Sequence, residues 1–131
     1  MKNRVIFLAD FFSEDLLGGA ESNDSVLIQH LESQDYDLEK LHCREVTVES
    51  LQSYGNDVRL IVSNFVSLRE DAKRYIQENL QYVIYEHDHK YVATRDPSRF
   101  PSFKIPDDKI INRNFYENAI AVVVLLSLIH I

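Results

Sequence analysis

The 131-residue sequence has only one cysteine, no long apolar run and no excess of basic residues. The single thiol, Cys43, cannot form an internal disulfide, so nothing indicates an oxidising compartment and we expect a cytoplasmic protein. The apolar segments at 5–9 and 119–131 are shorter than the roughly 20 residues that a membrane-spanning helix needs. The first of them ends at Asp10, too early for a signal peptide. We therefore expect neither secretion nor a membrane span.

The balance of charge argues against a nucleic-acid partner. The chain carries 21 acidic and 14 basic residues, a net charge of −7, and the basic residues form no cluster. Affinity for a phosphate backbone comes from clustered lysine and arginine, so this class of partner is excluded. A hydrophobic content of 45% with 27% charged residues is that of one ordinary globular domain.

Several common catalytic and nucleotide-binding motifs are absent. The sequence contains no Gly-x-Gly-x-x-Gly fingerprint, no Gly-Lys-Ser/Thr of a P-loop and no Gly-x-Ser-x-Gly nucleophile elbow. Asp10 follows the first apolar run and suggests a phosphoacceptor site. Such a site also needs an acidic pair, a late lysine and a central aspartate on the third strand, but the third strand here ends Ser63-Asn64-Phe65. The sequence therefore argues against a dinucleotide-binding fingerprint, a P-loop, a nucleophile elbow and a phosphoacceptor site.

Apolar runs that are continuous rather than alternating predict strands buried on both faces of a parallel sheet. The predicted strands are 5–9, 38–43, 58–65, 82–85 and 121–125. Helical patterns separate them, so the chain is expected to be α/β, a Rossmann-like doubly wound parallel sheet of about five strands. In this architecture ligands bind at the carboxyl ends of the strands.

The helix signals are of three kinds. After the first strand, an apolar face is predicted from four residues: Val26, Leu27, His30 and Leu31. Ser67 and Glu70 have the spacing of a capping box and predict the start of a helix that runs to about Leu80. Gly55 predicts the left-handed end of a short helix around 48–53.

Gly18 and Gly19 lie where the loop after the first strand becomes a helix. At such a position the free backbone N–H groups and the helix dipole favour an anion, and glycine allows its close approach. The alternative is an ordinary flexible turn into a helix, and the pair alone does not decide between them.

A second polar cluster, at 86–91, follows the fourth predicted strand. If this segment is extended, His87 and His89 point to one side and Asp88 to the other. The two histidines could hold a metal ion, for which zinc would need at least one more ligand. The alternative is a set of polar residues that cap the sheet.

Together these clusters resemble the N-terminal domain of GT-B-type retaining glycosyltransferases, in the family-four-like group that carries Gly-Gly-Ala-Glu after the first strand. The resemblance extends over residues 4–125. Its motifs are 18–21, 85–91, 95–98 and 114–119, and their combination is more specific than any one of them.

The resemblance implies that the donor diphosphate binds at Gly18 and Gly19. It also implies that His87 lies near the reacting sugar, where it orients or hydrogen-bonds the substrate rather than acting as a base. The substrates would be a nucleoside-diphosphate sugar and the hydroxyl of an acceptor such as a glycan. No metal or other cofactor is required in this class.

Four further residues follow from the same resemblance. Asp88, His89 and Lys90 would lie toward the acceptor, and Glu21 has a counterpart in the family to which we assign no role. The donor domain would be a second, C-terminal unit that this sequence does not include, so we expect the chain by itself to be inactive.

The last six residues, 126–131, resemble the in-frame translation of adapter DNA used in sequencing libraries. We therefore interpret 1–125 as the acceptor-side domain and 126–131 as a non-native tail. Two alternatives stay open: a stand-alone Rossmann-like module that binds an anion or sugar, and a metal-dependent hydrolase at the two histidines.

Overall fold

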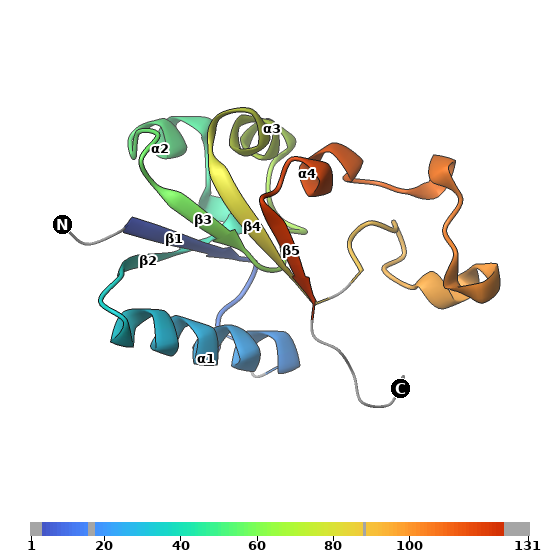
Figure 1. Ribbon diagram of the computed structural model, residues 1–131, viewed down its shortest axis with the longest axis horizontal. Helices are drawn as coiled ribbons and strands as arrows, with labels where there is room; N and C mark the ends of the chain where they lie inside the picture. Colours follow the sequence, from blue (N-terminus) through green and yellow to red (C-terminus); the bar gives the residue numbers. More distant parts are fainter. Residues whose placement is uncertain (1–3, 16–17, 88, 125–131) are drawn as a thin grey trace.

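The computed structural model describes residues 4–15, 18–87 and 89–124, which form a five-stranded parallel sheet with helices on both faces (Figure 1). The strands are β1 (Arg4–Ala9), β2 (Asp37–His42), β3 (Arg59–Val62), β4 (Gln81–Glu86) and β5 (Ala121–Val124). The helices are α1 (Gly19–Ser33), α2 (Val48–Gln52), α3 (Glu70–Asn79) and α4 (Arg113–Glu117). Four 3-10 turns are η1 (Cys43–Glu45), η2 (Pro97–Arg99), η3 (Pro101–Phe103) and η4 (Asp107–Lys109). The predicted doubly wound α/β fold is confirmed.

The strand order is β2-β1-β3-β4-β5, and every neighbouring pair is parallel. The chain therefore turns to one side of β1 for β2 and to the other side for β3. The connections diverge between the carboxyl ends of β1 and β3, which leaves a crevice there. This topological switch point is the expected place for a ligand.

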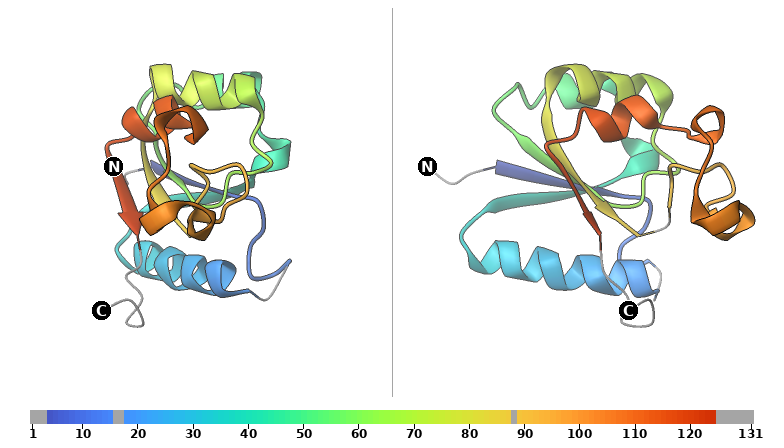
Figure 2. Two further views of the ribbon diagram at one scale, coloured as in Figure 1. Left: turned by 90° about the vertical axis from the view of Figure 1, so that its right-hand side faces the viewer. Right: turned by 45° about the vertical axis from the view of Figure 1, so that its right-hand side comes forward.

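The two faces of the sheet are covered unequally. Helix α1 lies on one face, whereas α2, α3 and α4 lie on the other (Figures 1 and 2). The larger core lies on the side of α2, α3 and α4 and includes Leu60, Ile76 and Phe115. The core on the α1 side is built from four buried side chains: Phe7, Ala9, Phe12 and Ile28. None of the helices among the described residues has the length and apolar character needed to cross a membrane.

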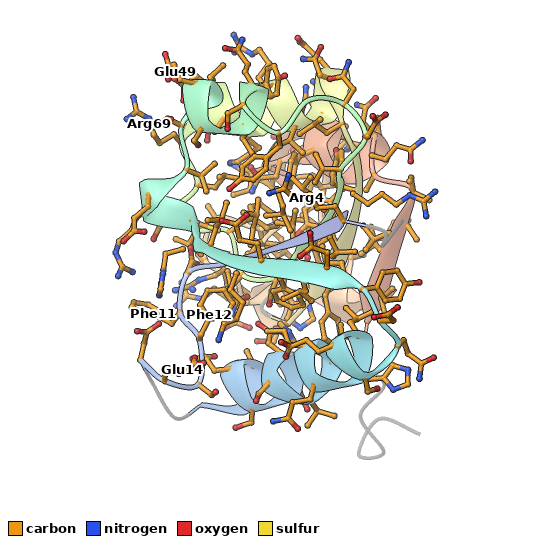
Figure 3. All side chains as sticks on the ribbon, turned by 90° about the vertical axis from the view of Figure 1, so that its left-hand side faces the viewer. Arg4, Phe11, Phe12, Glu14, Glu49 and Arg69 are labelled. Carbon is orange, nitrogen blue, oxygen red and sulfur yellow. The ribbon has the colours of Figure 1, made fainter. Side chains whose placement is uncertain are left out.

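The loop after β1 contributes to the smaller core. Phe12 is buried and turns inward, whereas its neighbour Phe11 is largely exposed and points away from the sheet (Figure 3). The Phe12 ring contacts the ring of Phe7 and the edge of the His42 imidazole. These contacts hold the first residues after β1 against the smaller core.

Of the two helix boundaries predicted from Gly55 and Ser67, the first is found and the second is not. Gly55 has φ +73°, the left-handed conformation predicted to end the helix before it. A capping box that was not predicted from the sequence lies at Thr47 and Ser50, where each side chain bonds the other residue's backbone at the start of α2. The predicted box at Ser67 is wrong, because α3 begins at Glu70.

The predicted apolar face of α1 is found only in part, since Leu27 packs against the smaller core. The residues of α1 that are buried against the sheet are Glu21, Asp24 and Ile28, whereas Val26 is 68% exposed and His30 is exposed too. The helix is turned so that polar side chains face the sheet, because Asp24 has a buried partner on the β4 side.

Candidate functional site

A pocket of about 420 Å³ lies at the topological switch point, and we call it the α1 pocket. It is bounded by the carboxyl ends of β1 and β3 and by the amino end of α1. Its lining residues are Asp10, Phe11, Gly18, Gly19, Ala20, Glu21, Asn64, Val66, Ser67 and Arg95. The structure thus places the predicted phosphate-binding glycines at the position where this topology builds its sites.

The amino end of α1 is open at the glycine pair. Gly18 is the N-cap residue, and its carbonyl accepts the first helical bond, from Ser22 N–H at 3.0 Å. The preceding N–H groups of the first turn have no acceptor within the helix. A Cβ built on Gly19 would meet no atom within 4 Å. Free donors and open space at a helix amino end are the conditions that anion binding needs.

The Glu21 carboxylate lies close to this open helix end. A Cβ on Gly18 would lie 2.9 Å from Glu21 Oε1, so the glycine makes room for a carboxylate of this chain. The Glu21 side chain is largely buried and folds back over the first turn of α1. An acidic group there is stabilised by the helix dipole. Any bound anion has to share the helix end with Glu21 or displace it.

Asp10 connects two loops of the α1 pocket. Its carboxylate accepts hydrogen bonds from the backbone N–H groups of Val66, at 2.9 Å, and Ser67, at 2.8 Å. Its backbone carbonyl accepts from the Arg44 guanidinium at 3.3 Å. Asp10 therefore holds the segment after β3 against the end of β1. The sequence marked this acid as following a strand, but not its acceptor role toward a segment 56 residues away.

His87 follows β4, as predicted, but it lies under α1. Its Nε2 is 3.0 Å from Asp24 Oδ1, and the two side chains are only 5% and 2% exposed. The imidazole also contacts the ring of Tyr85, with 4.6 Å between ring centroids. His87 does not line the α1 pocket. Asp24 was missed from the sequence, although its i+3 spacing from Glu21 places both acids on one helix face.

The other predicted histidine points elsewhere. His89 has φ +53°, so the segment is not extended, and the expectation that it shares a side with His87 is wrong. Its Nδ1 lies 2.8 Å from the hydroxyl of Tyr91 in an exposed position. Asp88 lies outside the described residues. Among the residues that are described, no three His, Cys, Asp or Glu side chains form a group that could hold a metal ion.

Lys90 lies in a buried network with Glu86. Its ammonium donates to Glu86 Oε1 and, at 3.1 Å, to Asn64 Oδ1, while the Tyr116 hydroxyl donates to the second oxygen of Glu86. Burial alone would raise the pKa of Glu86, but the bonds from Lys90 and Tyr116 outweigh it and hold that pKa below the ordinary value of 4.5. Glu86 is therefore a carboxylate paired with Lys90 at neutral pH.

With this geometry in place, comparison with known proteins adds no relative. No protein family, no curated protein and no solved structure matches the chain significantly.

Proposed function

We propose that this chain is the acceptor-side half of a GT-B-type retaining glycosyltransferase and that its α1 pocket holds the diphosphate of a nucleoside-diphosphate sugar. The observation that carries the proposal is the position of Gly18 and Gly19. They open the amino end of α1 inside a pocket at the switch point between β1 and β3. The four sequence motifs that resemble this family support the same assignment.

The α1 pocket would supply backbone donors rather than most of the positive charge. The N–H groups of Gly19 and Ala20 lie at the positive end of the helix dipole. Among the charged lining residues Arg95 is a cation, whereas Asp10 and Glu21 are acids. A diphosphate therefore needs further cations, which a second, donor-binding domain would contribute across the cleft. We accordingly expect no sugar transfer by the 131-residue chain alone.

In the proposed reaction an acceptor hydroxyl attacks the anomeric carbon and the nucleoside diphosphate leaves. Backbone dipoles and basic groups stabilise the charge that develops on the leaving diphosphate. His87 would help to orient the groups of the site. Its Nε2 already contacts Asp24 and its side chain is buried. This fits an orienting role better than that of an exposed general base.

The binding of the diphosphate is tested by changing one backbone donor. Gly19→Pro removes the N–H at the first helical position, where proline is well tolerated, and Gly19→Ala is the matched control that keeps it. We expect uridine and guanosine diphosphates to shift the amide signals of residues 18–21 in ¹⁵N NMR spectra of the parent and the alanine variant. The proline variant should bind at least several-fold more weakly. Unmoved signals with every nucleoside diphosphate would refute the proposed site.

A second candidate function is a stand-alone module that binds an anion or sugar, and the five-stranded sheet with its own core favours it. The source gene discriminates between the two. Resequencing across the codon for Leu125 with a different library preparation should reveal a continuing frame, whose full product should transfer sugar from a nucleotide donor. A stop codon after Ile131 would favour the binding module instead.

A further inference from the structure

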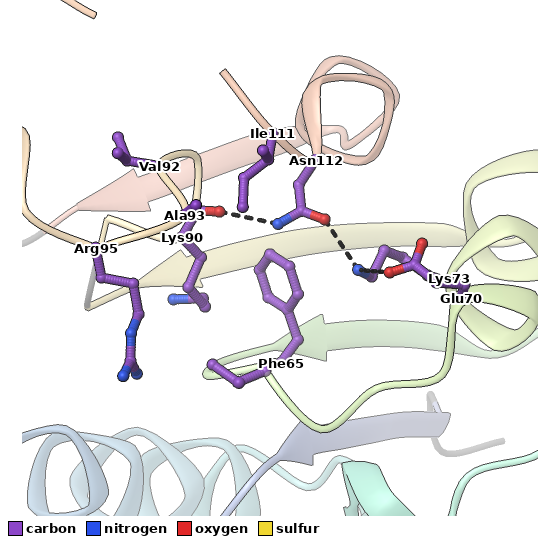
Figure 4. A pocket seen from close by; sticks show the side chains of 10 residues that line it. Phe65, Glu70, Lys73, Lys90, Val92, Ala93, Arg95, Ile111 and Asn112 are labelled. Carbon is purple, nitrogen blue, oxygen red and sulfur yellow. Dashed lines mark hydrogen bonds and ion pairs between the residues drawn. The ribbon is translucent and has the colours of Figure 1, made fainter. Parts of the chain in front are cut away.

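A second pocket, of about 330 Å³, opens beside the α1 pocket, and we call it the lysine pocket (Figure 4). Its lining residues are Phe65, Val66, Glu70, Lys73, Lys90, Val92, Ala93, Arg95, Ile111 and Asn112. It shares Val66 and Arg95 with the α1 pocket, so the two hollows adjoin at the carboxyl edge of the sheet. Of its lining residues, Lys90 is the one for which the family resemblance implies a role, on the acceptor side.

Most of the charged side chains that line the lysine pocket are basic. They are Lys73, Lys90 and Arg95, against one acid, Glu70, and a second acid, Glu86, pairs with Lys90 from outside the lining. The Glu70 side chain is 85% exposed, so solvent screens its pairing with Lys73. The lining is therefore richer in basic than in acidic side chains, a composition that favours anions.

Each of the two ammonium groups makes two hydrogen bonds with this chain, one fewer than it can donate. Lys73 Nζ donates to Glu70 Oε1 and to Asn112 Oδ1, each at 2.9 Å. Lys90 Nζ likewise has two acceptors, Glu86 and Asn64. An ammonium has three N–H groups, so across the described parts of the chain one donor on each lysine has no protein acceptor.

The two lysines are held in place before any ligand binds. They lie on either side of the Phe65 ring, whose centroid is 5.5 Å from Lys73 Nζ and 5.1 Å from Lys90 Nζ (Figure 4). Asn112 joins them, because its amide accepts from Lys73 and donates to the Lys90 carbonyl at 2.9 Å. Lys90 is 2% exposed and Lys73 is 8% exposed. Little side-chain entropy remains to be lost when an anion binds.

We propose that the lysine pocket binds a small organic anion, a phosphate ester or a carboxylate. Its anionic group accepts the remaining N–H donor of Lys73, in a lining to which Lys90 and Arg95 add further basic groups, and its uncharged body packs against the apolar wall formed by Val92 and Ile111. The volume lies near the lower end of the range for small-molecule sites, about 300–1,000 Å³. This site stands on residues other than the glycine pair. Combined with the proposed function, it would make the acceptor an anionic one.

The test compares charged and uncharged probes of one shape. Glucose 6-phosphate, glucuronate and glucose are titrated into the 131-residue chain, and the ¹⁵N NMR signals of residues 73, 90 and 112 are followed. We expect one or both anions to shift these signals and glucose to leave them unchanged. The anion that binds with the higher affinity shows whether the pocket prefers phosphate or carboxylate. Equal responses to glucose and to both anions would overturn the proposal.

Two variants and one control locate the site. Lys73→Gln removes a charge-assisted donor and should weaken anion binding about tenfold. Ile111→Glu places a negative charge on the half-exposed wall, where folding is not at risk, and should weaken it as well. Lys104→Gln removes an exposed lysine outside the pocket and should have no effect. Unchanged affinity in both pocket variants would refute the site.

The proposed nucleotide site can fail independently of this one. Gly19→Pro changes the α1 pocket alone, so it should leave the response of residues 73, 90 and 112 to the anions intact. Anion binding lost in Lys73→Gln but kept in Gly19→Pro supports the lysine pocket, whatever the nucleotides do.

Discussion

At the scale of single residues, Gly18 illustrates how a glycine can be needed for reasons other than backbone freedom. Its φ of −134° and ψ of 171° are extended values that any residue can adopt. A side chain at this position would meet the Glu21 carboxylate, 2.9 Å from the position of a Cβ, and Glu21 would have to move. The glycine and the glutamate of the motif therefore act as a packed pair. That pairing gives Glu21 a role at the helix start that the sequence resemblance left unassigned.

This pair predicts a coupled effect on stability. Gly18→Ala should lower the free energy of unfolding by about 1 kcal/mol, because the new methyl group displaces the Glu21 side chain and alanine is a poor N-cap residue. In a Glu21→Ala background the same substitution should cost measurably less. Urea unfolding of the parent, both single variants and the double variant measures the coupling. Additive effects of the two substitutions on the unfolding free energy would show that the introduced methyl group does not contact the Glu21 side chain.

Glu86 predicts an acid-sensitive contribution to stability. Its folded-state pKa is lowered below 4.5 because the bonds from Lys90 and Tyr116 outweigh the effect of burial. The stability that the carboxylate contributes is therefore fully present above 4.5 and is lost as the pH falls through the lowered pKa. Glu86→Gln should flatten the dependence of the unfolding free energy on pH in this acid range.

The same substitution has a cost at neutral pH. Removing one charge of a buried pair leaves Lys90 without its anion, so Glu86→Gln should destabilise the chain by about 3 kcal/mol at neutral pH. Unfolding curves measured at neutral pH and in acid give both quantities. An unchanged acid slope in the variant would mean that other carboxylates dominate it.

At the scale of elements, α1 depends on one buried polar contact. It is the only helix on its face of the sheet among the described residues, and the core beneath it is small. Asp24 joins it to His87 at the end of β4 through a 3.0 Å contact that is almost completely buried. A buried polar pair of this kind fixes the rotation of the helix, which explains why Val26 points into solvent.

Asp24→Ala should therefore loosen α1 more than the rest of the chain. The substitution leaves the buried imidazole of His87 without its partner, and we expect a loss of about 2 kcal/mol in the free energy of unfolding. Hydrogen exchange should accelerate in α1 and change little in α3. Asn23→Ala, at an exposed position of the same helix, is the control. Equal acceleration in α1 and α3 would contradict a local role for the pair.

The elements also show which parts of the fold are readable from sequence. The continuous apolar run of β1 is predicted and found because buried parallel strands need apolar side chains on both faces. The start of α3 is missed because the backbone of Ser67 is bonded by Asp10 from another loop. Such long-range acceptors leave no local pattern. The buried face of α1 is missed in part for the same reason, since two of its three buried residues, Glu21 and Asp24, are acids.

For the candidate site, the sequence predicts position better than orientation. Gly18 and Gly19 are expected at a ligand-binding edge and lie there, because strand and helix order alone place them. His87 and His89 diverge because His89 adopts a positive φ that residue type does not dictate. The residues that line the lysine pocket come from α3, from the loop after β4 and from the segment before α4, so no short sequence motif could have predicted it.

At the scale of the whole molecule, β5 forms an edge of the sheet with no strand on its outer side among residues 4–15, 18–87 and 89–124. It is an edge strand, and its three valines are 41%, 47% and 55% exposed. Edge strands present unpaired N–H and C=O groups that can pair with another chain, and proteins usually protect them with charge or a covering element. Here the residues are Ala121, Val122, Val123 and Val124, which carry no charge.

We therefore expect the 131-residue chain to self-associate through β5 when it is purified alone. Val123→Lys places a charge at the edge and should shift the chain toward monomer in sedimentation velocity experiments over a range of concentrations. Val26→Lys is the matched control, because Val26 is more exposed but lies on α1, away from the edge. If both variants reduced association equally, added charge rather than strand pairing would be the cause. A parent chain that stays monomeric at every concentration would show that the edge of β5 is protected in solution despite its exposed valines.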